Sequence, residues 1–168
     1  MRQIKLNADH LSYAEGESLG NNARSAMSSL HKPAVYVVDD DVGVLGSLRF
    51  LLETDGFEVR TFRSGAALLS AGPPTDVDCL VIDYKMPDMN GLDLVTLLRG
   101  NNISAPVILI TGYPDENIAV RAATAGVGHV LLKPLLEDSL ARHIKSAIDE
   151  ALPAAAINQA PTSVNLRK

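Results

Sequence analysis

The 168-residue sequence contains a single cysteine, Cys79, and no tryptophan. One cysteine excludes an intramolecular disulfide and a cysteine-based metal cluster, so we expect Cys79 to be a small core residue. Aromatic residues make up only 4 % of the chain, whereas apolar residues make up 46 %. The chain can therefore build a substantial core, and that core must be mainly aliphatic.

Basic residues are not in excess either. The chain has 15 lysines and arginines against 20 aspartates and glutamates, and its formal net charge is -5. Domains that bind nucleic acid or an anionic membrane normally carry a basic face, so we expect neither as a direct partner. No apolar run reaches the ~18 residues of a transmembrane helix, and residues 1–22 lack the apolar stretch of a signal peptide. These absences predict a cytoplasmic protein.

Three segments of the chain differ in composition. Residues 1–32 are rich in Ser, Asn, Ala and Gly and show no periodicity, which predicts a flexible N-terminal extension. Residues 152–168 predict a flexible C-terminal tail in the same way. Between them, residues 33–151 hold the dense apolar pattern of one folded domain.

Short apolar runs alternate with segments of helical periodicity inside residues 33–151. Strands are predicted at 34–38, 57–62, 79–82, 106–110 and 129–132. Helices are predicted at 42–54, 64–70, 90–99, 115–125, and from 135 or 137 to 151. This alternation predicts an α/β fold, a doubly wound five-stranded parallel sheet with five helices.

Polar residues stand where four of these strands end. They are Asp39, Asp40 and Asp41 after the first strand, Asp83 after the third, Thr111 after the fourth and Lys133 after the fifth. Ligands of open parallel sheets bind outside the carboxyl ends of the strands. We therefore expect these side chains to gather at one edge of the sheet.

The chemistry of this set favours phosphoryl transfer. Neighbouring carboxylates repel one another, and a hard divalent cation such as Mg²⁺ removes that repulsion. A central carboxylate, Asp83, can then act as nucleophile and form an acyl phosphate. Lys133 and the Thr111 hydroxyl can hold the other phosphoryl oxygens.

Simpler roles are open for some of these residues. The three successive aspartates could stabilise the start of the following helix, and for Asp41 we prefer this interpretation, because a helix needs only one capping carboxylate. Lys133 alone would be a surface lysine, and Thr111 alone is uninformative. The histidines lack metal-ligand spacing, so we expect surface or packing roles for His10, His31, His129 and His143.

Four runs, in order and at strand ends, carry a family resemblance: VYVVDDD, VIDYKMPDMNG, VILITG and VLLKP. They resemble the signatures of the CheY-like receiver domains of response regulators, and they are most similar to receivers of the FixJ type. The resemblance covers residues 33–151 and implies the CheY/flavodoxin-like fold.

The resemblance also implies roles for individual residues. Asp83 would be the phosphoacceptor, with Thr111 and Lys133 as phosphoryl contacts and switch residues. Asp40 would bind Mg²⁺ directly, Asp39 mostly through water, and Lys85 through its backbone carbonyl, with Asp83 completing the metal site. The Lys133–Pro134 bond would be cis. Lys85 and Tyr113 would tune how fast the phosphoryl group is lost, unless both point into solvent.

One position departs from the family. Receivers often carry an aromatic residue three positions before the conserved lysine, and here that residue is Val130. The aromatic part of the usual switch is therefore not expected in this chain.

Together these features predict a stand-alone receiver that takes a phosphoryl group from a sensor histidine kinase or a histidine phosphotransfer protein. The resemblance places a downstream protein partner on the face formed by helix 115–125, strand 129–132 and the last helix, and phosphorylation could drive dimerisation. The alternative is a truncated FixJ-type transcription regulator without its DNA-binding domain. An aspartyl-nucleophile phosphatase fits less well, because its nucleophile would lie on the first strand.

Overall fold

The computed structural model describes residues 31–113, 115–135 and 137–157. Most of the expected N-terminal extension, 1–32, lies outside these residues, as do residues 158–168 of the expected tail. None of the helices in the described ranges is apolar enough over its length to cross a lipid bilayer.

The described chain forms a parallel sheet of five strands in the order β2-β1-β3-β4-β5. The strands are β1 Ala34–Val38, β2 Glu58–Phe62, β3 Cys79–Asp83, β4 Val107–Thr111 and β5 His129–Leu132. This order reverses between β1 and β3, which is the point where doubly wound sheets bind their ligands. The predicted fold class is confirmed.

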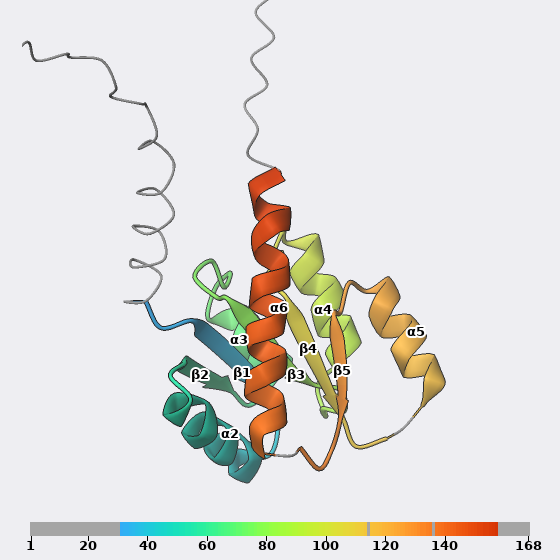
Figure 1. Ribbon diagram of the computed structural model, residues 1–168. Coiled ribbons are helices and arrows are strands. Elements are labelled where there is room, and N and C mark those ends of the chain that lie inside the picture. Colours follow the sequence, from blue (N-terminus) through green and yellow to red (C-terminus); the bar gives the residue numbers. More distant parts are fainter. Residues whose placement is uncertain (1–30, 114, 136, 158–168) are drawn as a thin grey trace, which may run out of the picture. The chain divides into compact units, whose positions relative to one another are not determined.

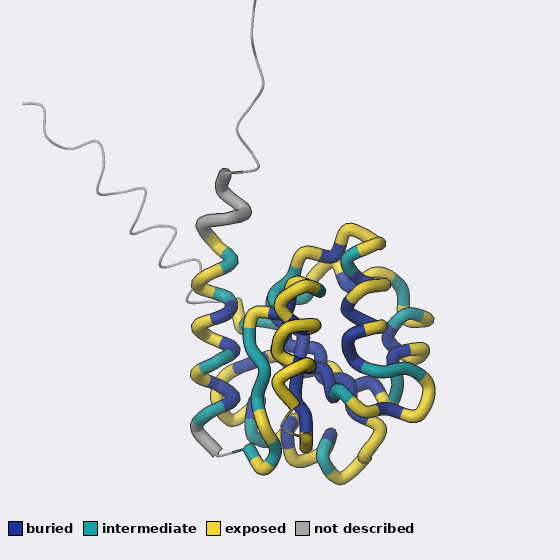
Figure 2. Tube along the Cα trace, turned by 90° about the vertical axis from the view of Figure 1, so that its right-hand side faces the viewer, coloured by how far each residue is buried: buried dark blue, intermediate teal, exposed yellow. Residues whose placement is uncertain are grey.

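In the described chain, four helices connect the strands, a fifth follows β5, and together they cover both faces of the sheet (Figure 1). They are α2 Val42–Thr54, α3 Gly65–Ser70, α4 Gly91–Gly100, α5 Glu116–Thr124 and α6 Glu137–Ile157. One core layer packs α2 and α6 on the sheet, and the other packs α3, α4 and α5 on the opposite face. Figure 2 shows the strands buried between helices whose outer surfaces are exposed. The buried side chains are mainly Val, Leu and Ile, as the composition predicts.

Capping residues define where the helices begin. The carboxylate of Asp41 accepts hydrogen bonds from the backbone N–H groups of Gly43 and Val44, at 2.8 and 3.2 Å. This is the capping role preferred for Asp41 from the sequence. Ser64, Asn90 and Asp115 cap α3, α4 and α5.

The last helix is longer than predicted. It continues to Ile157, six residues past the expected end of the domain at residue 151. Pro153 suggested a break, because proline costs a helix one backbone hydrogen bond. Three alanines follow Pro153, and alanine has the highest helix propensity of all residues. The first part of the expected tail, residues 152–157, is therefore helical.

Cys79 lies inside the sheet and is fully buried. Burial raises the pKa of its thiol to about 12. A thiol that stays protonated is a poor nucleophile and a poor metal ligand, which agrees with the core role expected for Cys79.

Candidate functional site

Three carboxylates meet at the carboxyl edge of the sheet, beside the reversal of strand order. Asp39 and Asp40 directly follow β1, and Asp83 is the last residue of β3. Each of these side chains can place an oxygen within 4.8 Å of an oxygen from both others. The strands β1 and β3 pair in parallel, with Val38 opposite Ile82, so their ends bring the carboxylates together.

Lys133 supplies the positive charge of the site. Its ammonium nitrogen lies 2.8 Å from Oδ1 of Asp83 and 3.1 Å from Oδ2 of Asp39. The lysine follows β5, and the Lys133–Pro134 peptide bond is cis, as the resemblance implied. Both carboxylates are buried, so these ion pairs are weakly screened by solvent.

Burial and ion pairing shift the pKa values of Asp83 and Lys133 in opposite directions. Burial raises the pKa of Asp83 above its ordinary value, and Asp39 adds to that rise, while the hydrogen bond and charge of Lys133 offset part of it. Burial alone would lower the pKa of Lys133, but its contacts with the two carboxylates raise it overall. Lys133 is thus held protonated, and its charge favours the ionised form of Asp83.

Asp39 and Asp40 differ in how their oxygens are used. Oδ1 of Asp39 accepts the backbone N–H of Asp41 at 2.9 Å, and Oδ2 accepts from Lys133. The side chain of Asp40 is exposed and makes no hydrogen bond within the described residues. Asp40 therefore has free oxygens for a cation, whereas both oxygens of Asp39 are already engaged.

Thr111 ends β4, the strand next to Asp83, and its side chain is buried. Its hydroxyl accepts the backbone N–H of Tyr113 at 3.1 Å and lies 3.4 Å from the Tyr113 carbonyl oxygen, to which it donates. In the described part of the chain no hydrogen bond joins Thr111 to Asp83. The sequence placed Thr111 at the correct edge, but its hydroxyl is held by the following loop.

The segment after Asp83 fixes the position of that carboxylate. The backbone N–H of Lys85 donates to Oδ2 of Asp83 at 3.1 Å. Gly91, the first residue of α4, packs so closely on β3 that a Cβ there would lie 2.5 Å from the Asp83 carbonyl oxygen. Its N–H also donates to the carbonyl of Tyr84 at 2.8 Å. The sequence suggested only a helix start at Gly91; its contact with Asp83 depends on tertiary packing and left no signal in the sequence.

Chemically, the site is an acidic cluster able to hold a hard metal ion. Its carboxylates offer the oxygen ligands that Mg²⁺ and Ca²⁺ prefer. The exposed oxygens of Asp40 give such an ion access from solvent, so the residues present fit a divalent cation.

The family comparison decides the identity of this arrangement. Residues 35–145 match the family of response regulator receiver domains. The chain belongs to this family. The resemblance of its four motifs to CheY-like receivers is thereby confirmed.

Curated relatives of this receiver include two regulators from Bradyrhizobium diazoefficiens. The chain is 38 % identical to the transcriptional regulatory protein FixJ over 124 residues, which cover 74 % of this chain and 60 % of FixJ. It is 36 % identical to nodulation protein W over 118 residues, which cover 70 % of this chain and 52 % of that protein. The chain thus spans between half and two thirds of these relatives' length.

Solved structures show the same receiver fold. A response regulator receiver domain protein from Clostridium thermocellum has a TM-score of 0.68 and 30 % identity, with 73 % of this chain and 98 % of that chain covered. A CheY-like receiver domain protein from Methanospirillum hungatei has a TM-score of 0.69 and 27 % identity, with 74 % and 99 % covered.

In this receiver, Val130 occupies the position where an aromatic switch residue is common in the family. Val130 lies in β5, is partly buried, and packs against the core cluster that also includes Ile118 and Ala122 of α5.

Proposed function

We propose that this receiver domain is a phosphorylation switch in which Asp83 is the phosphoacceptor. One observation carries the proposal: Lys133 and the Lys85 backbone N–H each bind a different oxygen of Asp83. The carboxylate is thereby oriented between a cation and the open side of the acidic cluster. The donor is a phosphohistidine of a sensor histidine kinase or of a histidine phosphotransfer protein.

The transfer is a substitution at phosphorus. A carboxylate oxygen of Asp83 attacks the phosphorus, and the P–O bond forms while the P–N bond to the donor imidazole breaks. The electron pair of the broken bond stays on the imidazole nitrogen, which takes a proton from solvent. The signal ends when water attacks the same phosphorus, the carboxylate of Asp83 leaves, and inorganic phosphate is released. The domain catalyses only these two steps on itself.

The acidic cluster would hold Mg²⁺ through Asp40, Asp83 and the backbone carbonyl of Lys85, with Asp39 acting mostly through water. The free oxygens of Asp40 and the engaged oxygens of Asp39 support this division. When bound, Mg²⁺ supplies positive charge that offsets the carboxylates and the phosphoryl oxygens.

Lys133 and Thr111 would convert phosphorylation into a change of shape. A phosphoryl group on Asp83 offers new oxygens to Lys133 and to the Thr111 hydroxyl. For Thr111 to donate there, its hydroxyl must leave the Tyr113 carbonyl, so the loop that leads to α5 must rearrange. The face formed by α5, β5 and α6 would then engage a downstream protein or a second receiver, in the cytoplasm.

The chain could act as a stand-alone switch or as the receiver part of a transcription regulator. The second possibility is favoured by one observation: the relatives FixJ and nodulation protein W are longer, and FixJ is named as a transcriptional regulatory protein. Both possibilities use the same chemistry at Asp83.

Acetyl phosphate with Mg²⁺ tests the proposal directly. Intact mass spectrometry should show the addition of one phosphoryl group, lost on treatment with base. Asp83→Asn should abolish labelling, whereas Asp55→Asn, a change of the same kind at the exposed end of α2, should label like the wild type. Labelling of Asp83→Asn at the native rate would refute Asp83 as acceptor.

A further inference from the structure

A groove runs between α4 and α5, away from the acidic cluster. Its volume is about 500 Å³, and its lining includes Leu92 and Arg99 of α4, Val120 and Arg121 of α5, and Ala125. The two helices lie next to each other on the same face of the sheet (Figure 1). We call this feature the α4–α5 groove.

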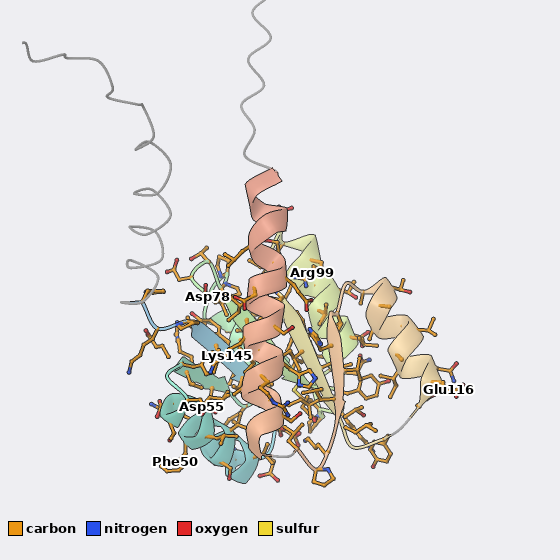
Figure 3. The ribbon with its side chains drawn as sticks, viewed as in Figure 1. Phe50, Asp55, Asp78, Arg99, Glu116 and Lys145 are labelled. Carbon is orange, nitrogen blue, oxygen red and sulfur yellow. The ribbon has the colours of Figure 1, made fainter. Side chains whose placement is uncertain are left out.

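Arg99, in the last turn of α4, brings a positive charge to the groove (Figure 3). Its guanidinium donates to the backbone carbonyls of Ile103, Ala105 and Gly126, at 2.6, 2.9 and 3.1 Å. These acceptors are neutral, and no carboxylate of the described residues forms an ion pair with Arg99. Burial lowers the pKa of Arg99, a direction that reflects the desolvation cost of its charge. An anion in the groove would compensate that cost.

Arg121 adds a second cation without a carboxylate partner. It donates to the phenol oxygen of Tyr84 at 3.3 Å and forms no ion pair within the described ranges. One carboxylate, Asp93, also lines the groove, but it accepts a hydrogen bond from the side-chain amide of Asn90. The groove therefore has two cations against one carboxylate, so its lining carries a net positive charge.

An apolar surface lies beside these cations. Val120 is 69 % exposed. It lies in the groove with Leu92 and Ala125. A small anion such as phosphate would satisfy the arginines but leave Val120 in water. A ligand with both carboxylates and aliphatic side chains would cover both.

We propose that the α4–α5 groove binds an acidic amphipathic helix of a partner protein. A third helix can lie between two neighbouring helices and place its apolar side chains into the groove. Here its aliphatic side chains cover Val120 and Ala125, and its Glu or Asp side chains pair with Arg121 and Arg99. The proposed binding uses the groove of the unphosphorylated protein. It therefore does not depend on whether Asp83 is the phosphoacceptor.

Two fluorescein-labelled peptides provide the probe. Each is about 18 residues long, enough for partial helicity in isolation, and carries Leu along one face. One peptide has Glu beside the Leu face, and the other has Gln at the same positions. Fluorescence anisotropy with the full chain should show at least tenfold tighter binding of the Glu peptide. Rising salt should weaken that binding, because ion pairs at a surface are screened.

Variants locate the site. Arg121→Gln and Val120→Ser change exposed side chains, and each should weaken binding of the Glu peptide about fivefold or more. Arg49→Gln, the same change on α2, should have no effect. Circular dichroism melting should show that all three variants fold.

Three results would overturn the proposal: no binding of the Glu peptide at millimolar concentration, equal binding of both peptides, or unchanged affinity in Arg121→Gln and Val120→Ser. None of these results would affect labelling of Asp83 by acetyl phosphate, so the two proposals fail separately.

Discussion

The ammonium nitrogen of Lys85 lies 3.4 Å from the phenol oxygen of Tyr113 and 4.9 Å from the centroid of its ring. Lys85 stands two residues after Asp83, and Tyr113 stands two residues after Thr111. The pair thus joins the loops that follow β3 and β4 across the edge of the site. The sequence left open whether these side chains point separately into solvent, and the structure shows that they contact each other.

From this contact we predict that Lys85 and Tyr113 lengthen the lifetime of a phosphoryl group on Asp83. If the paired side chains hinder an in-line water, Tyr113→Ala should lose phosphate several-fold faster, a change of about 1 kcal/mol in the barrier. Lys85→Ala should have a similar effect, and the double variant should add little, because each single change already breaks the pair. The decay of the phosphorylated protein, followed by intact mass, measures this. Glu116→Gln, at the start of α5, is the control (Figure 3). Wild-type decay in both single variants would show that these side chains do not shield the site.

A second prediction concerns the metal. Asp40 makes no hydrogen bond among the described residues, whereas Asp39 is bound by Asp41 and Lys133. Asp40→Asn should therefore lose most of the affinity for Mg²⁺, about tenfold or more, while Asp39→Asn should lose less. Isothermal titration of Mg²⁺ into each variant gives the comparison. Equal losses in the two variants would contradict the assignment.

A third prediction follows from the raised pKa of Asp83. Lys133 offsets part of the rise caused by burial, so Lys133→Met should raise the pKa of Asp83 further. Phosphorylation needs the carboxylate ionised, and the acid limb of its rate should therefore shift to higher pH in the variant. The overall rate should fall as well, because in our proposal the lysine also contacts the phosphoryl group.

The pH dependence of folding stability provides an independent measure of the same pKa shift of Asp83. A carboxylate whose pKa is higher in the folded than in the unfolded state binds its proton more tightly when folded. The melting temperature of Lys133→Met should therefore gain more than that of the wild type as pH falls through the raised pKa toward the ordinary pKa of an unfolded aspartate. Lys145→Gln, on α6 and over the ring of Phe57, should follow the wild type. Parallel profiles for Lys133→Met and the wild type would argue against this coupling.

A fourth prediction compares two glycines. A Cβ at Gly91 would lie 2.5 Å from the Asp83 carbonyl oxygen, whereas a Cβ at Gly46 would meet nothing within 4 Å. Gly91→Ala should cost roughly 1–3 kcal/mol of unfolding free energy and slow phosphorylation by displacing Asp83. Gly46 lies on the exposed face of α2, and Gly46→Ala should add about 0.5–1 kcal/mol to the unfolding free energy. Urea unfolding measures both changes, and equal stabilities would exclude the tight contact.

Much of the fold was predictable because local signals agreed with tertiary packing. The segment 42–54 was predicted with the observed ends, because Asp41 caps it and Gly56, at φ 92°, follows its end. The strands β1, β3 and β4 are buried on both faces, and their continuous apolar runs reflect that burial. The end of α6 was missed because local propensity outweighed a single proline.

The site was predictable in its residues but not in its contacts. The ends of parallel strands necessarily meet at one edge, so the positions of Asp83, Thr111 and Lys133 followed from the strand assignment. The Thr111–Tyr113 hydrogen bonds depend on a loop conformation that composition does not specify. Likewise, His129 and His143 lie far apart in sequence, yet their rings pack edge to face with centroids 5.4 Å apart. This is one of the packing roles expected for the histidines.

The two ends of α5 are held differently, because Arg99 of α4 contacts the backbone near the carboxyl end of α5. At its carboxyl end, Gly126 is tied by Arg99 to the backbone that leads into β4. At its amino end, α5 is reached through the loop that Thr111 holds by two hydrogen bonds to Tyr113. A displacement that begins at Thr111 would therefore move the first turn of α5 more than its last turn, because Arg99 holds the last turn.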